Sequence, residues 1–183
     1  MGVRVNVYFS HDLLGDADDL PDQAIARLQQ TLPAARAIDS YWNKRQPEVS
    51  SVQRWEKWPV SPRDRIVRRI EGPGTLLLSL TPNGAILSAG ARWLGFLTID
   101  PLRRVYLTAI EAVGHSLHAQ IMAICADSQE TALEVFLGGG AQEDCIAELQ
   151  RVCGAPQPTA SEIAQDLAER DPARMWFLER LAD

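Results

Sequence analysis

Alternating hydrophobic and polar positions at the N-terminus predict the first strand. Val3, Val5, Val7 and Phe9 alternate with other residues along the chain. A period of two places such a set on one face of a strand. A polar loop rich in carboxylates, residues 11–19, follows this pattern. We therefore expect an N-terminal strand that leads into an exposed acidic loop.

The segment after this loop has the period of an amphipathic helix. Asp19 is placed to cap the helix, and Pro21 suits its first turn. We expect Pro33 to end or bend the helix, because proline has no N–H to donate and clashes with the preceding turn. The apolar positions spaced by three and four residues are Ile25, Leu28 and Leu32.

The next region is predicted to contain one strand and one helix. We interpret residues 50–58 as a strand that Pro59 closes. Ser61 followed by proline is typical of a helix start, and we expect that helix to reach about Ile70. The Gly-Pro-Gly run at 72–74 would end it.

A meander of antiparallel strands is expected after this turn. Pro82, Asn83 and Gly84 form a sequence typical of a tight turn. The continuous apolar run 76–78 suggests that at least one strand is covered on both faces. The predicted strand segments are residues 75–80, 85–88 and 92–99.

The C-terminal half is predicted to be rich in helices. Asp100 followed by proline marks a helix start. After Gly114 the helix either continues to Cys125, or ends near Leu117 and is followed by a buried strand over 119–125. We prefer the second interpretation, because Gly114 interrupts the pattern and a new helix start follows.

That new start is the pair Asp127 and Glu130, which has the spacing of a capping box. Later helices are expected over residues 128–137, 142–152 and 159–170, with a last segment from Asp171. Residues 1–183 are thus predicted to form a single globular domain of the α+β class, with helices packed on an antiparallel or mixed sheet.

Composition narrows the class of partner. The chain has 183 residues, 46% of them hydrophobic, and a net charge of −6. This acidic balance argues against nucleic acid and favours a basic protein partner. No apolar run is long enough to span a membrane, and the N-terminus lacks the features of a signal peptide. We therefore expect a cytoplasmic protein.

No recognisable catalytic, cofactor or metal motif is found. The glycine run 138–140 lacks the Lys-Ser or Lys-Thr of a phosphate loop. His115 and His118 could share a metal with Cys125 or Asp127, but the spacing matches no zinc pattern. We predict no cofactor and no metal. The three cysteines are expected to be free thiols, because they are odd in number and have apolar neighbours.

Acidic and aromatic residues supply a candidate contact surface. Asp16, Asp18 and Asp19 lie in the acidic loop, and Trp55 and Trp58 lie in the predicted strand at 50–58. Exposed tryptophans are frequent anchors of protein interfaces. In a strand, residues three apart point to opposite faces, so the two tryptophans cannot share one core.

The order of features from Asp100 onward carries a family resemblance. The run 100–109 is followed by Gly114, by Ala126-Asp-Ser and by a helix that ends in three glycines; a Gly154-x-Pro turn and Trp176 come later. This order resembles immunity proteins of bacterial polymorphic and contact-delivered toxin systems. The resemblance covers the C-terminal half, and it implies a cytosolic protein that binds and blocks a cognate toxin.

Two other functions remain open at this point. One is a small enzyme with an unrecognised site around His115, His118 and Asp127, which requires these side chains to meet in one pocket. The other is a self-associating adaptor or structural protein. The sequence does not identify the toxin, the true contact residues or the oligomeric state.

Overall fold

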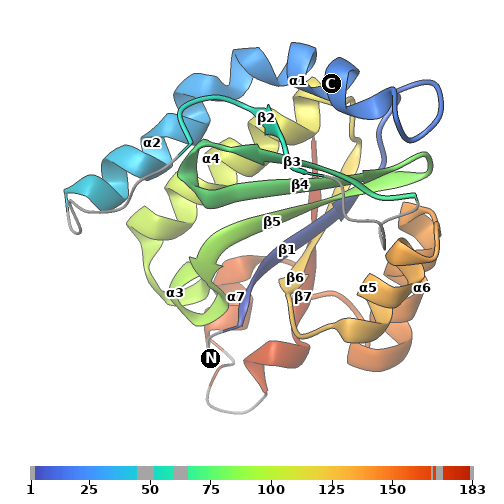
Figure 1. Cartoon of the computed structure of the whole chain (residues 1–183). Coiled ribbons are helices and arrows are strands. Elements are labelled where there is room, and N and C mark those ends of the chain that lie inside the picture. Colours follow the sequence, from blue (N-terminus) through green and yellow to red (C-terminus); the bar gives the residue numbers. More distant parts are fainter. Residues whose placement is uncertain (1–2, 45–51, 60–65, 166, 168–170, 182–183) are drawn as a thin grey trace.

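The core of the fold is a seven-stranded antiparallel sheet (Figure 1) with the strand order β2-β3-β4-β5-β1-β6-β7. A computed structural model describes residues 3–44, 52–59, 66–165, 167 and 171–181. The strands are β1 (Arg4–Phe9), β2 (Glu56–Lys57), β3 (Arg68–Gly72), β4 (Leu76–Thr81), β5 (Gly84–Arg92), β6 (Ile121–Ala126) and β7 (Trp176–Arg180). This confirms the α+β class.

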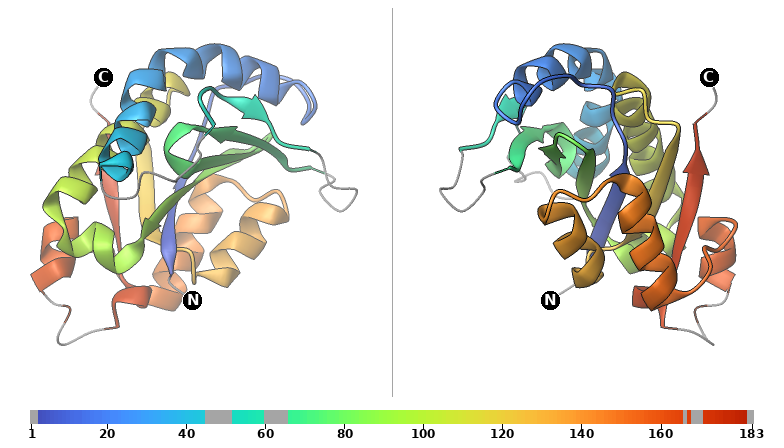
Figure 2. Two further views of the ribbon diagram at one scale, coloured as in Figure 1. Left: turned by 60° about the vertical axis from the view of Figure 1, so that its left-hand side comes forward. Right: turned by 90° about the vertical axis from the view of Figure 1, so that its right-hand side faces the viewer.

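Helices cover the two faces of the sheet unequally (Figures 1 and 2). The larger core packs α1 (Leu20–Leu28), α2 (Leu32–Asn43), α3 (Trp93–Thr98), α4 (Asp100–Ser116) and α7 (Ala160–Gln165) against one face. A smaller core lies on the other face under α5 (Glu130–Leu137) and α6 (Gln142–Cys153).

The predicted N-terminal strand is confirmed as β1, which lies near the middle of the sheet. Val5, Val7 and Phe9 belong to the larger core, whereas Tyr8 faces the smaller one. Asn6 is also buried, and its Oδ1 accepts a hydrogen bond of 2.7 Å from the Ser88 hydroxyl. The alternation therefore separates two cores rather than a core from solvent.

The predicted helix from Ser61 to Ile70 is wrong in its second half. Residues 61–65 lie outside the described residues, and Arg68–Gly72 forms β3, paired with β4. Cross-strand pairing with the apolar β4 outweighs the local helix-start signal here. Residues 50 and 51 of the predicted strand at 50–58 lie outside the described residues, and between 52 and 58 only Glu56–Lys57 forms a strand, β2.

Two further boundaries differ from the prediction. The helix is interrupted before Pro33: α1 ends at Leu28, a 3-10 turn covers Gln29–Thr31, and Pro33 lies in the first turn of α2, where its missing N–H costs nothing. The predicted strand at 92–99 is instead helix α3, which starts at Trp93 directly after β5. The meander is otherwise confirmed as β4 and β5.

The aspartates expected to cap helices act in other ways. Asp19 precedes α1 but its side chain makes no capping hydrogen bond, and Asp100 is the first residue of α4, where it pairs with Arg103. Asp127 does not form the predicted capping box; its Oδ1 accepts a 2.8 Å hydrogen bond from the Arg4 backbone N–H. A carboxylate at the end of an interior strand thus satisfies a strand N–H group instead of a helix one.

The preferred interpretation of the region after Gly114 is confirmed. Helix α4 ends at Ser116, and β6 returns as a buried strand of the sheet between β1 and β7. The helix predicted from Thr159 is described as α7, Ala160–Gln165, and residues 166 and 168–170 of that prediction lie outside the described residues. None of the helices among the described residues is both long and apolar enough to cross a membrane.

Candidate interaction surface

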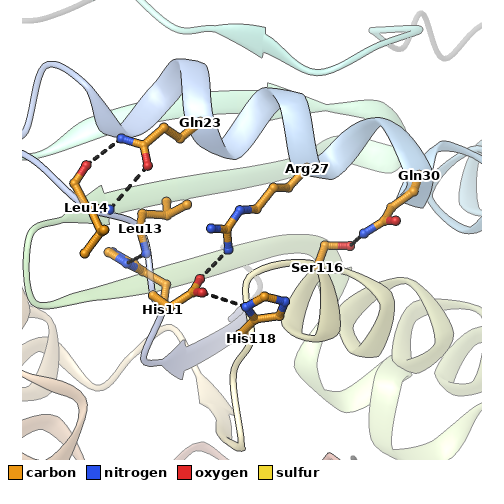
Figure 3. A network of polar contacts seen from close by, with 9 residues as sticks. His11, Leu13, Leu14, Gln23, Arg27, Gln30, Ser116 and His118 are labelled. Carbon is orange, nitrogen blue, oxygen red and sulfur yellow. Dashed lines mark hydrogen bonds and ion pairs between the residues drawn. The ribbon is translucent and has the colours of Figure 1, made fainter.

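The loop between β1 and α1 has a shape fixed by its own hydrogen bonds. The Gln23 side chain, from α1, donates to the Leu14 carbonyl and accepts a 3.3 Å hydrogen bond from the Leu14 N–H (Figure 3). The Asp16 carboxylate accepts from the Asp18 N–H at 3.1 Å, and the Asp16 carbonyl accepts from the Asp19 N–H at 3.2 Å. The loop therefore presents exposed carboxylates, and a 78% exposed Leu14, from a defined backbone.

Trp58 is 43% exposed and lies beside this loop. It shares a small depression of about 120 Å³ with Asp18, Pro21 and Arg68, among others. Its backbone N–H donates a 2.9 Å hydrogen bond to the Arg69 carbonyl, which continues the β2–β3 pairing by one residue. The indole is thus carried on a backbone tied to the sheet.

Ion pairs connect the strands at this edge to the loop and to α1. The Arg68 guanidinium donates to the Asp18 Oδ1 at 2.8 Å and 2.6 Å, and the Lys57 Nζ lies 2.7 Å from an Asp22 oxygen. Asp18 and Asp22 remain largely exposed. Exposed pairs of this kind contribute little to stability, but they set the positions of the charges.

The structure brings four of the five predicted contact residues to one edge of the molecule. Asp16, Asp18 and Asp19 share the fixed loop, and Asp18 and Trp58 line one depression. We call this group of four residues the acidic edge.

The prediction for Trp55 is wrong, because this residue lies in the larger core. It is 2% exposed, and its indole N–H donates a 3.0 Å hydrogen bond to the Thr31 hydroxyl. A Cβ at Gly72 would come within 2.4 Å of the Trp55 ring, so strand β3 packs directly on the indole. Trp58, three residues later, is left outside the core.

A second polar cluster lies at the other end of the same loop (Figure 3). The Asp12 carboxylate pairs with Arg27 from α1 and accepts a 2.6 Å hydrogen bond from His118 Nδ1. Desolvation acts against ionisation of Asp12, but the hydrogen bonds from His118 and Arg27 prevail and lower the pKa of this carboxyl. His118 has a left-handed backbone, φ 57°, after the end of α4.

His11 is held in a neutral form beside this cluster. Its Nε2 donates to the Thr81 carbonyl at 2.8 Å, so its Nδ1 is the acceptor for the Leu13 N–H at 3.2 Å. Burial lowers the pKa of His11. Both ring nitrogens are therefore occupied in fixing the start of the loop.

The alternative site of His115, His118 and Asp127 is not assembled. The His115 Nδ1 donates to the Glu111 carbonyl of its own helix at 2.8 Å, whereas His118 turns to Asp12. Asp127 follows the far end of β6, a strand of six residues that spans roughly 20 Å. Within the described ranges no three potential metal-ligating side chains converge.

The three cysteines are free thiols on the α5–α6 side of the sheet. Cys125 and Cys145 are buried and Cys153 is half-buried. Burial raises the pKa of all three, that of Cys145 to about 11. Because the thiolate is the nucleophilic form, these cysteines are poor nucleophiles at neutral pH.

Comparisons with protein-family models, with curated proteins and with solved structures found no match.

Sequence reasoning missed the partners that organise the acidic edge. Gln23 and Arg68 hold the loop from two different elements, and neither belongs to a motif. Arg68 lies in a segment that the sequence predicts to be helical. No pattern in the sequence indicates that its side chain contacts Asp18, 50 residues earlier in the chain. In β3 the buried residues Ile70 and Gly72 alternate with partly buried ones. This alternation is the one feature of the segment that indicates a strand.

Proposed function

We propose that this protein binds a cognate bacterial toxin through the acidic edge and thereby neutralises it in the cytoplasm. The observation that carries the proposal is the exposed Trp58, which shares a depression with Asp18 beside a loop of carboxylates. A partly exposed tryptophan in a depression with a charged rim has the anatomy of an interface hot spot.

The charge of the acidic edge supports a basic partner. Asp16 and Asp19 are exposed and make no ion pair with other described residues. The chain as a whole has a net charge of −6. Complementary charge raises the rate of encounter and penalises partners of the same sign.

The fixed shape of the loop supports tight binding. Hydrogen bonds from Gln23 and within Asp16–Asp19 already order the backbone, so less conformational entropy is lost when a partner docks. The family resemblance in the C-terminal half supplies the toxin as the class of partner.

The first experiment identifies the partner. The tagged protein is used to capture its partner from native lysate, and the captured protein is then expressed with and without this chain. We expect one stoichiometric partner, encoded by a neighbouring gene, that stops growth alone and is harmless in the presence of this chain. If no such partner is captured, and no neighbouring gene product is toxic, the proposal fails.

The second experiment locates the interface on that partner. Trp58→Ala is expected to weaken binding by about 30-fold or more, the size typical of a hot-spot tryptophan. Leu94→Ala, which removes a 55% exposed apolar side chain elsewhere, is the matched control and should leave affinity unchanged. Equal affinities for wild type and Trp58→Ala would exclude the acidic edge while leaving toxin binding itself intact.

A further inference from the structure

The structure contains a pocket of about 580 Å³. Helices α2 and α3, which contribute to its lining, lie on the opposite side of the molecule from the loop between β1 and α1 (Figure 1). Four elements and one turn contribute to the pocket: Trp42 from α2, Thr75 from the turn before β4, Arg92 from β5, Gly95 from α3 and Leu102 from α4. Its size is within the range of small-molecule sites. We call it the Thr75 pocket.

The wall at Thr75 is strained. Thr75 has φ 59°, a left-handed conformation that β-branched residues rarely adopt, and it directly follows Gly74 at φ 72°. The turn is held in place because the Gly74 N–H donates to the buried Asp39 carboxylate at 3.1 Å. Gly90 leaves room for the Thr75 side chain, whose hydroxyl oxygen would lie 1.8 Å from a Cβ there. Strain that the surroundings enforce in this way is concentrated at functional sites.

Aromatic and hydroxyl groups are joined in the same wall. The Trp42 indole N–H donates to the Tyr106 hydroxyl at 3.0 Å. The rest of the lining includes the aliphatic side chains of Leu102 and a 40% exposed Ile99. This lining suits an apolar ligand body.

Arg92 supplies the charge of the Thr75 pocket. It is exposed, and its guanidinium makes no hydrogen bond or ion pair with another described residue. Arg4 is its direct partner across the β1–β5 pair, and the Arg4 side chain makes no such bond either among these residues. Two arginines opposite each other repel, so an anion bound beside them is favoured.

We propose that the Thr75 pocket binds a small organic carboxylate whose apolar, aryl-sized body lies against Trp42 and Leu102 while its carboxylate pairs with Arg92. A guanidinium binds a carboxylate through two parallel hydrogen bonds, which makes this charge selective for planar anions. This site is separate from the acidic edge and does not depend on toxin binding.

The test uses indole-3-propionate as the probe and tryptamine as its cationic counterpart. Binding is followed by two-dimensional NMR, in which the Trp42 indole N–H signal reports on the pocket directly. We expect saturable shifts of this signal with indole-3-propionate and none with tryptamine. Equal binding of both probes, or binding of neither, would overturn the proposal.

Three variants assign the roles of the lining. Arg92→Gln is expected to weaken binding of indole-3-propionate at least tenfold, whereas Arg104→Gln, an equal charge change on the exposed face of α4, should not alter it. Gly95→Met places a side chain in the pocket and should abolish binding while circular dichroism remains that of the wild type. If Arg92→Gln binds indole-3-propionate as tightly as the wild type, this arginine does not bind the carboxylate, and the proposal is contradicted.

Discussion

The acidic edge and the Thr75 pocket are built on opposite principles. At the acidic edge, exposed charges on a loop are ordered by side-chain to backbone hydrogen bonds, and the backbone is relaxed outside its glycine. In the Thr75 pocket, charged groups are few and a strained turn is held by buried partners. An exposed charged loop beside a partly exposed tryptophan suits a macromolecule, whereas a larger apolar pocket with one cation suits a small anion.

The largest expected effect is a difference in unfolding free energy between alanine variants of the two tryptophans near β2, Trp55 and Trp58. Trp55→Ala removes a buried ring from the larger core and is expected to cost roughly 3–5 kcal/mol of unfolding free energy. Trp58→Ala should cost less than about 1 kcal/mol, because this side chain is largely outside the core. Urea unfolding of both variants measures the difference, and similar losses would contradict the assignment of Trp58 to an interface.

The next largest effect tests the close approach of Gly90 and Thr75. Gly90→Ala forces a Cβ against the Thr75 hydroxyl and is expected to cost about 1–3 kcal/mol. Thr75→Gly relieves the left-handed φ and removes the clashing atoms, so Gly90→Ala should cost less than about 1 kcal/mol in that background. Additive effects in a double-mutant cycle would show that the two positions do not touch.

A smaller, pH-dependent effect is expected at Asp12. Its pKa is lowered in the folded state from 3.8, so its stabilisation is present above about pH 4 and disappears as the pH falls through the folded pKa. Because Asp12 and Arg27 are partly exposed, Asp12→Asn should cost under about 1 kcal/mol at pH 7 and nothing near pH 2. Arg27→Gln should cause part of the same loss at pH 7, and the double variant should be no worse than the sum. A constant difference from pH 7 to pH 2 would exclude this cause.

Periodic patterns predicted the elements that lie wholly within the cores. The alternation around Val5 and Val7 gave β1, and the interruption at Gly114 correctly divided α4 from β6. Both signals are local, because the buried face of a regular element appears as a periodic pattern within a short stretch of sequence. The glycines at 138–140 likewise marked the end of α5.

Elements whose state depends on distant partners were not predictable in this way. Strand β3 is short and exists because β4 pairs with it, and α3 begins where β5 leaves the sheet. The acidic edge was anticipated through its own charges and Trp58, whereas its supports Gln23 and Arg68 act across 9 and 50 residues. No sequence pattern predicts the Thr75 pocket, because the sequence does not show that the backbone of a threonine adopts a left-handed conformation.

The acidic edge is tested most directly by the association rate with the captured toxin. The variant Asp16→Asn/Asp18→Asn/Asp19→Asn removes three charges but keeps an oxygen that can accept the loop hydrogen bonds. The control, Glu130→Gln/Glu134→Gln/Glu143→Gln, changes the net charge equally on α5 and α6.

Stopped-flow measurements at low and high salt compare both variants with the wild type. We predict that the aspartate variant associates about tenfold more slowly at low salt and loses most of the salt dependence, while the control stays close to the wild type. Association rates that are the same for all three proteins at both salt concentrations would contradict toxin binding through the acidic edge.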